Sequence, residues 1–211
     1  MRDNSPSVVI VDDDAEFRDS VGRLMRSVGV DTQQFPSVTD FLKAELPDRP
    51  TCLVVDVRMP GPSGLDLQRA LSAAKRELPI IFVTAHGDIP MSVEAMKAGA
   101  IEFLTKPFRD QDLLDAIEAG LARDHARRES AEADEELRKR FDSLSPRERE
   151  IMVQVTAGQL NKQIAYSIGI TESTVKVHRA NLMRKVKARS LPELSRMVDR
   201  LGLTPEQQQD A

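Results

Sequence analysis

Five short strand-like segments alternate with five amphipathic segments over the first half of the chain, and this alternation restricts the possible fold most strongly. The run Cys52–Val55 has no polar alternation and ends in turn residues, which is typical of a strand buried on both faces. Further strands are expected at Ser7–Val11, Val30–Phe35, Leu78–Val83 and Ala100–Leu104. The pattern predicts an α/β domain, (βα)5, in which helices cover both faces of a doubly wound parallel sheet.

Polar residues follow four of these strands, at the point where each strand ends. They are Asp12, Asp13, Asp56, Thr84 and Lys106. Because the carboxyl ends of parallel strands meet at one edge of a sheet, we expect these side chains to be neighbours. Taken singly, two of them have ordinary alternatives: Asp56 as the cap of a helix starting near Gly64, and Lys106 as a solvated loop lysine.

Three carboxylates at one edge repel one another and take up protons unless a cation joins them. Ligands that offer only oxygen favour a hard ion such as Mg²⁺. A carboxylate beside such an ion can attack a phosphoryl group and form an aspartyl phosphate. In this hypothesis Lys106 and the metal neutralise the developing charge, while Thr84 donates a hydrogen bond to a phosphoryl oxygen.

Four motifs in this half resemble the receiver domain of bacterial two-component response regulators, and the resemblance covers residues 7–122. They are Val-Asp-Asp-Asp, Asp-Val-Arg-Met-Pro-Gly, Thr-Ala-His-Gly-Asp and Lys-Pro-Phe. The run from His86 to Ala100 is similar to the FixJ branch in particular. The resemblance implies that Asp56 is the phosphoacceptor, and that Thr84 and Lys106 contact the phosphoryl group.

The same resemblance implies a metal site and a conformational switch. The implied Mg²⁺ ligands are Asp12, Asp13, Asp56 and the backbone carbonyl of Arg58. The aromatic position that changes rotamer on activation falls at Phe103, which lacks the hydroxyl of a tyrosine, and ordinary core packing is the alternative for this residue.

Charge is divided unevenly along the chain. Residues 1–122 hold 13 basic and 20 acidic residues, whereas residues 143–211 hold 11 basic and 7 acidic residues. The acidic part suits a cation site and the basic part suits a polyanion.

The pattern from Ser143 onward is purely helical. Ser145 and Glu148, with a proline between them, form the signature of a helix N-terminus. A short helix from Asn161 to Gly169 precedes a longer basic helix capped by Thr171, which predicts a helix-turn-helix. A further helix is expected over Leu191–Leu201.

Side chains near the start of the second helix of such a motif enter the major groove. The residues predicted to contact DNA bases or phosphates are Lys162, Thr174, Lys176, Val177, His178, Arg179 and Lys185. Val175 and Leu182 are expected to face the protein interior. The alternative is an amphipathic helix with a basic solvent face, but seven basic residues against one acidic residue in 161–190 favour DNA.

This half resembles the LuxR/NarL-type DNA-binding domain over residues 143–205, through its Leu-Ser-Pro-Arg-Glu-Arg-Glu, Asn-Lys-Gln-Ile-Ala and Thr-Val-Lys-Val-His-Arg segments. The resemblance implies that Lys176, Val177 and position 180 face bases. Ala180 stands where relatives carry lysine, so their preferred DNA sequence is not transferred.

We therefore expect a receiver domain over residues 1–122 and a small all-α helix-turn-helix domain over residues 143–211. Between them, residues 123–142 are rich in Ala, Arg and Glu, which favours a helical linker. A dimer contact along this segment and a partly frayed linker are both open alternatives.

Several classes are disfavoured. The single cysteine forms no internal disulfide and indicates a reducing cytoplasm. No apolar run approaches the roughly 18 residues of a membrane span, and the first apolar run is too short for a signal peptide. Three scattered histidines and one cysteine make no zinc constellation.

The two resemblances together imply a cytoplasmic transcriptional regulator. They imply that a sensor histidine kinase phosphorylates Asp56, that the receiver then dimerises and that the basic domain binds promoter DNA, with RNA polymerase as a further expected partner. One alternative is DNA binding independent of phosphorylation, with the receiver as an assembly surface. Another is an aspartyl-phosphate phosphatase, but Arg58 stands where the haloacid dehalogenases need a second Asp, so only slow self-dephosphorylation is expected.

Overall fold

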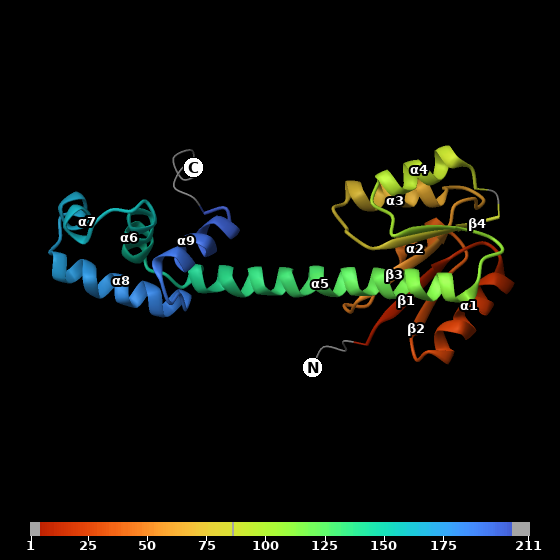
Figure 1. Ribbon diagram of the computed structural model, residues 1–211, viewed down its shortest axis with the longest axis horizontal. Coiled ribbons are helices and arrows are strands. Elements are labelled where there is room, and N and C mark those ends of the chain that lie inside the picture. The colour runs from red at the N-terminus through yellow and green to blue at the C-terminus, as the bar shows by residue number, and fades with distance from the viewer. Residues whose placement is uncertain (1–4, 86, 204–211) are drawn as a thin grey trace. The chain divides into compact units, whose positions relative to one another are not determined.

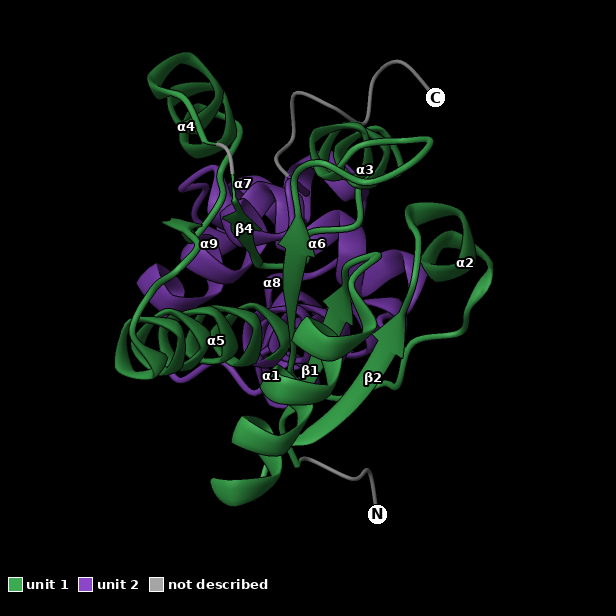
Figure 2. Cartoon of the chain, turned by 90° about the vertical axis from the view of Figure 1, so that its right-hand side faces the viewer, with its two compact units in different colours: residues 1–128 green, residues 129–211 purple. Residues whose placement is uncertain are grey.

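The computed structural model of the chain describes residues 5–85 and 87–203. Residues 1–4, 86 and 204–211 lie outside the described part. The expectation that the N-terminus holds no signal peptide therefore falls largely on residues that are not described. The chain forms two compact units, residues 1–128 and residues 129–211 (Figure 2). No helix in the described ranges is long and apolar enough to cross a membrane.

Five strands of the first unit form one parallel sheet in the order β2-β1-β3-β4-β5 (Figure 1). They are β1 (Ser7–Val11), β2 (Asp31–Phe35), β3 (Thr51–Asp56), β4 (Ile80–Thr84) and β5 (Glu102–Thr105). Every residue of β1, β3 and β4 is buried, as expected for strands covered on both faces. The predicted fold class is confirmed. Asp56 and Thr84 end their strands instead of following them.

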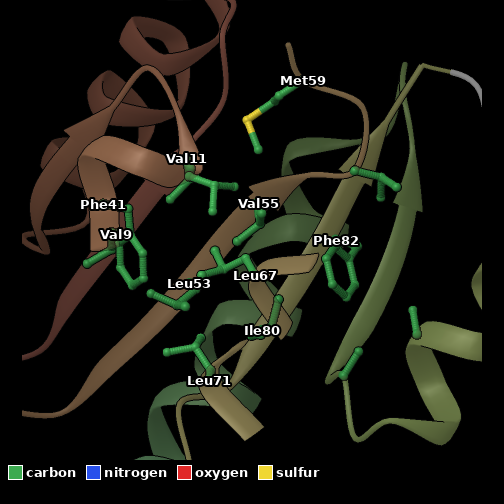
Figure 3. Close-up of a cluster of buried hydrophobic side chains, with 14 residues drawn as sticks. Val9, Val11, Phe41, Leu53, Val55, Met59, Leu67, Leu71, Ile80 and Phe82 are labelled. Atoms are coloured by element: carbon green, nitrogen blue, oxygen red, sulfur yellow. The ribbon is translucent and has the colours of Figure 1, made fainter. Parts of the chain in front are cut away.

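Helices cover the two faces of the sheet. They are α1 (Ala15–Ser27), α2 (Val38–Lys43), α3 (Gly64–Ala73), α4 (Ile89–Lys97) and α5 (Asp110–Asp142). On one face, side chains of α2, α3 and α4 such as Phe41 and Leu67 pack against Leu53 and Val55 of β3 (Figure 3). On the other face, α1 and α5 bury Met25 and other apolar residues against the sheet.

Helix α5 continues through the segment predicted as a charged linker. The frayed alternative is therefore not observed in the structure. The last turns of α5 belong to the second unit, where Leu137 and Phe141 join its apolar core. The domain limits expected at residues 122 and 142 remain predictions, because a division by contacts does not test independent folding.

The second unit is a helix-turn-helix bundle. Its helices are α6 (Pro146–Thr156), α7 (Asn161–Ile168), α8 (Glu172–Val186) and α9 (Leu191–Arg200). Ser145 and Glu148 form the predicted capping box of α6. Helix α7 ends at Gly169, whose φ of 68° is left-handed and natural for glycine. Ile164, Val175 and Leu182 are fully buried between the helices.

A buried carboxylate on α5 fastens this helix to the amino end of the sheet. Asp124 is fully buried and accepts a hydrogen bond from the amide of Thr51, the first residue of β3, at 3.0 Å. Its oxygens also accept from Arg127 and Arg128, both at 2.7 Å. No local pattern in the sequence indicates this cluster, because Asp124 and Thr51 are brought together only by packing.

We predict that Asp124→Ala lowers the free energy of unfolding of the first unit by about 2–4 kcal/mol, because it leaves a buried amide and two arginines without their acceptor. Asp115→Ala, an exposed carboxylate on the same helix, is the matched control and should change stability by less than about 0.5 kcal/mol. A urea titration followed through the NMR signals of the first unit measures both. Equal losses in the two variants would contradict the assigned role of Asp124.

Candidate functional site

Three aspartates meet at the carboxyl edge of the sheet. Asp12 and Asp13 directly follow β1, and Asp56 ends β3. The two strands are paired with Val11 opposite Val55, and this register brings the three carboxylates together. One oxygen of each lies within 4.8 Å of the others. Asp12 is fully buried, Asp56 is 8% exposed and Asp13 is exposed.

Lys106 belongs to this cluster. Its Nζ lies 2.7 Å from Asp12 Oδ2, and its side chain is only 21% exposed. The ammonium also sits 3.6 Å from the ring centroid of Phe17, a cation–π contact. The alternative of a solvated loop lysine is therefore wrong. The peptide bond from Lys106 to Pro107 is cis.

Burial raises the pKa of Asp56 above its ordinary value. The Lys106 ammonium opposes this rise, the Asp12 carboxylate adds to it, and the backbone amides of Val57 and Arg58 favour the ionised form. Three carboxylates against one ammonium leave the edge short of positive charge. Its donors are all oxygen, so a hard divalent cation fits the site.

The helix-cap alternative for Asp56 is wrong, because another residue fills that role. Ser63 accepts from the Asp66 amide at the start of α3, and Asp66 accepts in return from the Ser63 amide. Helix α3 begins at Gly64, where a Cβ would lie 2.4 Å from the carbonyl oxygen of Asp56. Glycine is thus required for the close approach of α3 to the end of β3.

Thr84 and Phe103 lie on neighbouring strands next to the aspartates. Thr84 is buried at the end of β4, and its carbonyl accepts from the Lys106 amide at 2.8 Å. Phe103 is half-buried, with its ring centroid 6.3 Å from that of Phe82. A Cβ on Gly87 would lie 2.8 Å from the Phe103 ring and 3.2 Å from Thr84 Cγ2. Gly87 therefore leaves room for the ring beside Thr84.

Two contacts of the cluster were not anticipated. Arg18 Nη1 donates to the Asp12 carbonyl oxygen at 2.6 Å, and Phe17 lies under Lys106. In the sequence, both residues look like ordinary positions of an amphipathic helix. The role of Gly87 beside Phe103 was also not anticipated, and only its place in the Thr-Ala-His-Gly motif pointed to this residue.

The predicted DNA-contacting residues differ in their exposure and in their hydrogen bonds to the protein. Lys162, Lys176 and Val177 are exposed, and Val177 is 59% exposed although it is apolar. Thr174 and His178 are partly exposed. Arg179, also partly exposed, donates to Asn161 Oδ1 at 2.9 Å and so links α8 to α7.

The scaffold positions on α8 agree with expectation. Val175 and Leu182 are fully buried, as predicted. Ala180 is exposed.

Lys185 has a protein partner where a DNA phosphate was expected. Its Nζ lies 2.6 Å from Glu148 Oε2 and also donates to the Ser143 carbonyl at 3.3 Å. The Glu148 side chain is only 4% exposed. Burial alone would raise the pKa of Glu148, but hydrogen bonds from Lys185 and Ser145 hold it below its ordinary value. We therefore leave Lys185 out of the DNA-contacting set.

Comparison with known protein families agrees with both halves of this description. Residues 8–118 match the response regulator receiver domain, and residues 142–198 match the luxR family of bacterial regulatory proteins. The chain belongs to the transcriptional response regulators that join a receiver to a LuxR-type DNA-binding domain.

Several relatives are similar over nearly the whole chain. Nodulation protein W of Bradyrhizobium diazoefficiens is 49% identical over 93% of this chain and 87% of its own length. The transcriptional regulatory protein FixJ of Rhizobium meliloti is 45% identical over 94% and 98%. Among solved structures, the response regulator StyR is 48% identical, with a TM-score of 0.83 over 93% of this chain and 99% of that one.

We predict that Lys185→Gln lowers the free energy of unfolding of the second unit by about 2 kcal/mol near neutral pH, because it leaves the buried Glu148 carboxylate without its cation. Since the folded-state pKa of Glu148 lies below its unfolded value, the pair stabilises the unit above the unfolded pKa. This stabilisation is lost as the pH falls through the folded pKa. The difference between wild type and variant should therefore shrink on acidification below about pH 4.

The matched control is Arg184→Gln, an exposed residue on the same helix, with an expected effect below about 0.5 kcal/mol. Urea titrations at several pH values, followed through the NMR signals of the second unit, provide the comparison. A pH-independent difference would show that the Glu148–Lys185 pair is not its source.

Proposed function

We propose that this protein is a switch in which phosphorylation of Asp56 by a sensor histidine kinase controls binding to promoter DNA. The observation that carries the proposal is the cluster of Asp12, Asp13 and Asp56 within 4.8 Å, with Lys106 bonded to Asp12. A buried, electron-rich carboxylate beside a cation site is the arrangement needed for a phosphoryl acceptor.

The chemistry at the acceptor is a transfer between two protein side chains. Bound Mg²⁺, held by Asp12, Asp13, Asp56 and the Arg58 carbonyl, would supply positive charge to the phosphoryl oxygens. An oxygen of Asp56 forms the new bond to phosphorus, and the bond from phosphorus to the kinase histidine breaks. Lys106, whose Nζ lies 2.7 Å from Asp12 Oδ2, neutralises the charge on the phosphoryl oxygens, and the Thr84 hydroxyl donates to one of them.

The switch follows from the added charge of about −1.5 to −2 on Asp56. Thr84 is drawn toward the phosphoryl group, and the space that it leaves favours inward rotation of Phe103 into the place of the Thr84 side chain. This movement changes the surface of α4, β5 and the start of α5. Three apolar residues of α4 are already exposed there: Ile89 at 79%, and Val93 and Met96 at 43% each. Their exposure supports a homodimer of phosphorylated receivers through this face.

The DNA-binding unit places α8 in the major groove. Lys176 and Val177 contact bases, the exposed Val177 suiting a thymine methyl group. Lys162 binds phosphate, and Thr174, His178 and Arg179 add contacts from the same end of the motif. RNA polymerase is the further partner of the DNA-bound dimer. Arg58 provides no general acid for hydrolysis, so the aspartyl phosphate is lost only by slow self-dephosphorylation.

We predict that wild-type protein incubated with acetyl phosphate and Mg²⁺ gains one phosphoryl group and binds promoter DNA at least about tenfold more tightly. Asp56→Asn should gain no phosphoryl group and keep the resting affinity. Asp19→Asn, an exposed carboxylate on α1, is the control and should behave as wild type. Intact mass and DNA affinity are measured on the same samples.

Two results would count against this proposal in different ways. If wild type accepts no phosphoryl group from acetyl phosphate or from a competent histidine kinase, Asp56 is not a phosphoacceptor. If wild type is phosphorylated but its DNA affinity is unchanged, Asp56 is the acceptor but phosphorylation is not coupled to DNA binding.

We predict distinct effects for two residues of the DNA surface. Val177→Ala should relax base preference at one position by about 1–3 kcal/mol. Lys162→Ala should weaken binding to all sequences similarly and reduce the slope of log affinity against log salt by about 0.9. Arg196→Ala, an exposed basic residue on α9, is the control and should leave both properties unchanged. Quantitative binding to a set of single-base operator variants at several salt concentrations separates the two effects.

A further inference from the structure

A second polar cavity lies in the first unit, at the end of the sheet away from the aspartates. It has a volume of about 450 Å³ and lies between the carboxyl-terminal end of α3, the start of β4, the loop after α4 and the middle of α5. Ile80, the first residue of β4, lines it, whereas Thr84 at the other end of that strand adjoins the aspartates. The two sites therefore occupy opposite edges of one sheet.

Basic side chains line this cavity from two sides. Lys75 and Arg76 come from the turn after α3, and Arg123 and Arg127 come from α5. Within the described residues, the side chains of Lys75 and Arg76 make no hydrogen bond or ion pair. Arg123 donates only a long bond, 3.5 Å, to the Gly99 carbonyl. Three cationic groups therefore line the cavity without a carboxylate partner.

The two acidic residues of the lining do not cancel this charge. Asp124 is fully buried and already bonded to Arg127 and Arg128, so it is not available to pair with the other cations of the cavity. Glu77 is left as the single acidic group against the other cations. This positive cavity occurs in a part of the chain where acidic residues outnumber basic ones, 20 against 13 over residues 1–122. A concave surface of one sign concentrates ions of the other sign.

The turn that presents the basic pair is the C-terminal cap of α3. It is closed by hydrogen bonds from the Lys75 amide to the Ser72 carbonyl and from the Arg76 amide to the Leu71 carbonyl. Lys75 has a φ of 53°, the left-handed conformation with which many helices end, and Lys187 after α8 has a similar φ. The cap therefore fixes the backbone from which Lys75 and Arg76 project.

The rest of the lining determines the class of ligand. Leu78, which is partly exposed, adds an apolar surface beside the cations, with Leu71 and Pro79 buried behind it. The volume lies in the range of about 300–1,000 Å³ typical of small-molecule sites. Guanidinium groups bind phosphate in a two-pronged geometry. We propose that this cavity binds a nucleoside phosphate, its phosphates on Arg76, Arg123 and Lys75 and its rings against the apolar surface. Neither phosphorylation of Asp56 nor DNA binding is required.

The test is calorimetric titration of the full chain with ATP in EDTA, which prevents Mg²⁺ from bridging ATP to the aspartates. Wild type should bind one ATP per chain. The double variant R76Q/R123Q should bind at least about tenfold more weakly, because it loses two phosphate-binding groups. Both residues are exposed and make no buried contact, so the variant should fold, and its NMR spectrum checks this.

The matched control is R23Q/K43Q, which removes the same charge from exposed positions on α1 and α2 outside the cavity. Its ATP affinity should stay within about twofold of wild type, as expected for distant screened charges. Asp56→Asn should also bind as wild type.

Three calorimetric results would overturn the proposal. The first is the absence of ATP binding by wild type at about 1 mM ATP. The second is an equal loss of ATP affinity in the two double variants, which would indicate only general attraction to basic surfaces such as α8. The third is equal affinity for pyrophosphate and ATP, which would overturn the nucleoside assignment, since the apolar surface would then add nothing.

Hydrogen exchange locates the bound ATP. It should show protection by ATP at the turn after α3 and around Arg123, and protection confined to the second unit would also contradict the site.

Discussion

Repulsion between carboxylates is the constraint on which the first unit depends. The parallel register of β1 and β3 holds Asp12 and Asp56 at one edge, and both are buried, so their charges are poorly screened by water. The ammonium group of Lys106 offsets part of this repulsion, because it is bonded to Asp12 and packed on the Phe17 ring. Arg18 adds a second cation at the Asp12 carbonyl oxygen, but two cations still do not balance three carboxylates. The remaining deficit is the physical basis of the proposed metal site and of the acceptor role of Asp56.

The strand that carries Asp56 is fixed at its first residue, which limits where a conformational change can occur. Thr51 begins β3 and donates its amide to the buried Asp124 of α5, while Asp56 ends the strand inside the aspartate cluster. A shift of β3 along its axis would break the hydrogen bond between Thr51 and Asp124. Added charge at Asp56 must therefore be accommodated by the neighbouring loops. Gly87, in the loop after β4, lies close against both Thr84 and the Phe103 ring.

Most of the fold and part of the site could be predicted from the sequence. Uninterrupted apolar runs define buried strands, and a parallel sheet then requires residues as distant as Asp12 and Lys106 to meet at one edge. The boundaries moved by a few residues because helix and strand ends depend on local hydrogen bonds, as at Thr84. Asp124 could not be predicted, since its role depends on the packing of α5 against the start of β3. The Glu148 partner of Lys185 was not anticipated for a similar reason, because the two residues are brought together only by packing.

The second unit shows how packing selects among charges that look equivalent in a sequence. Its basic residues predict a polyanion ligand, yet several guanidinium and ammonium groups are used inside the unit. Arg147 donates to the Ile168 carbonyl, Arg200 pairs with Asp134, and Lys185 neutralises Glu148. The basic residues that stay exposed along the helix-turn-helix are Lys162, Lys176, Arg184, Lys187 and Arg189. Charge content thus indicates the class of ligand, whereas the packing of the folded unit decides which side chains are exposed to it.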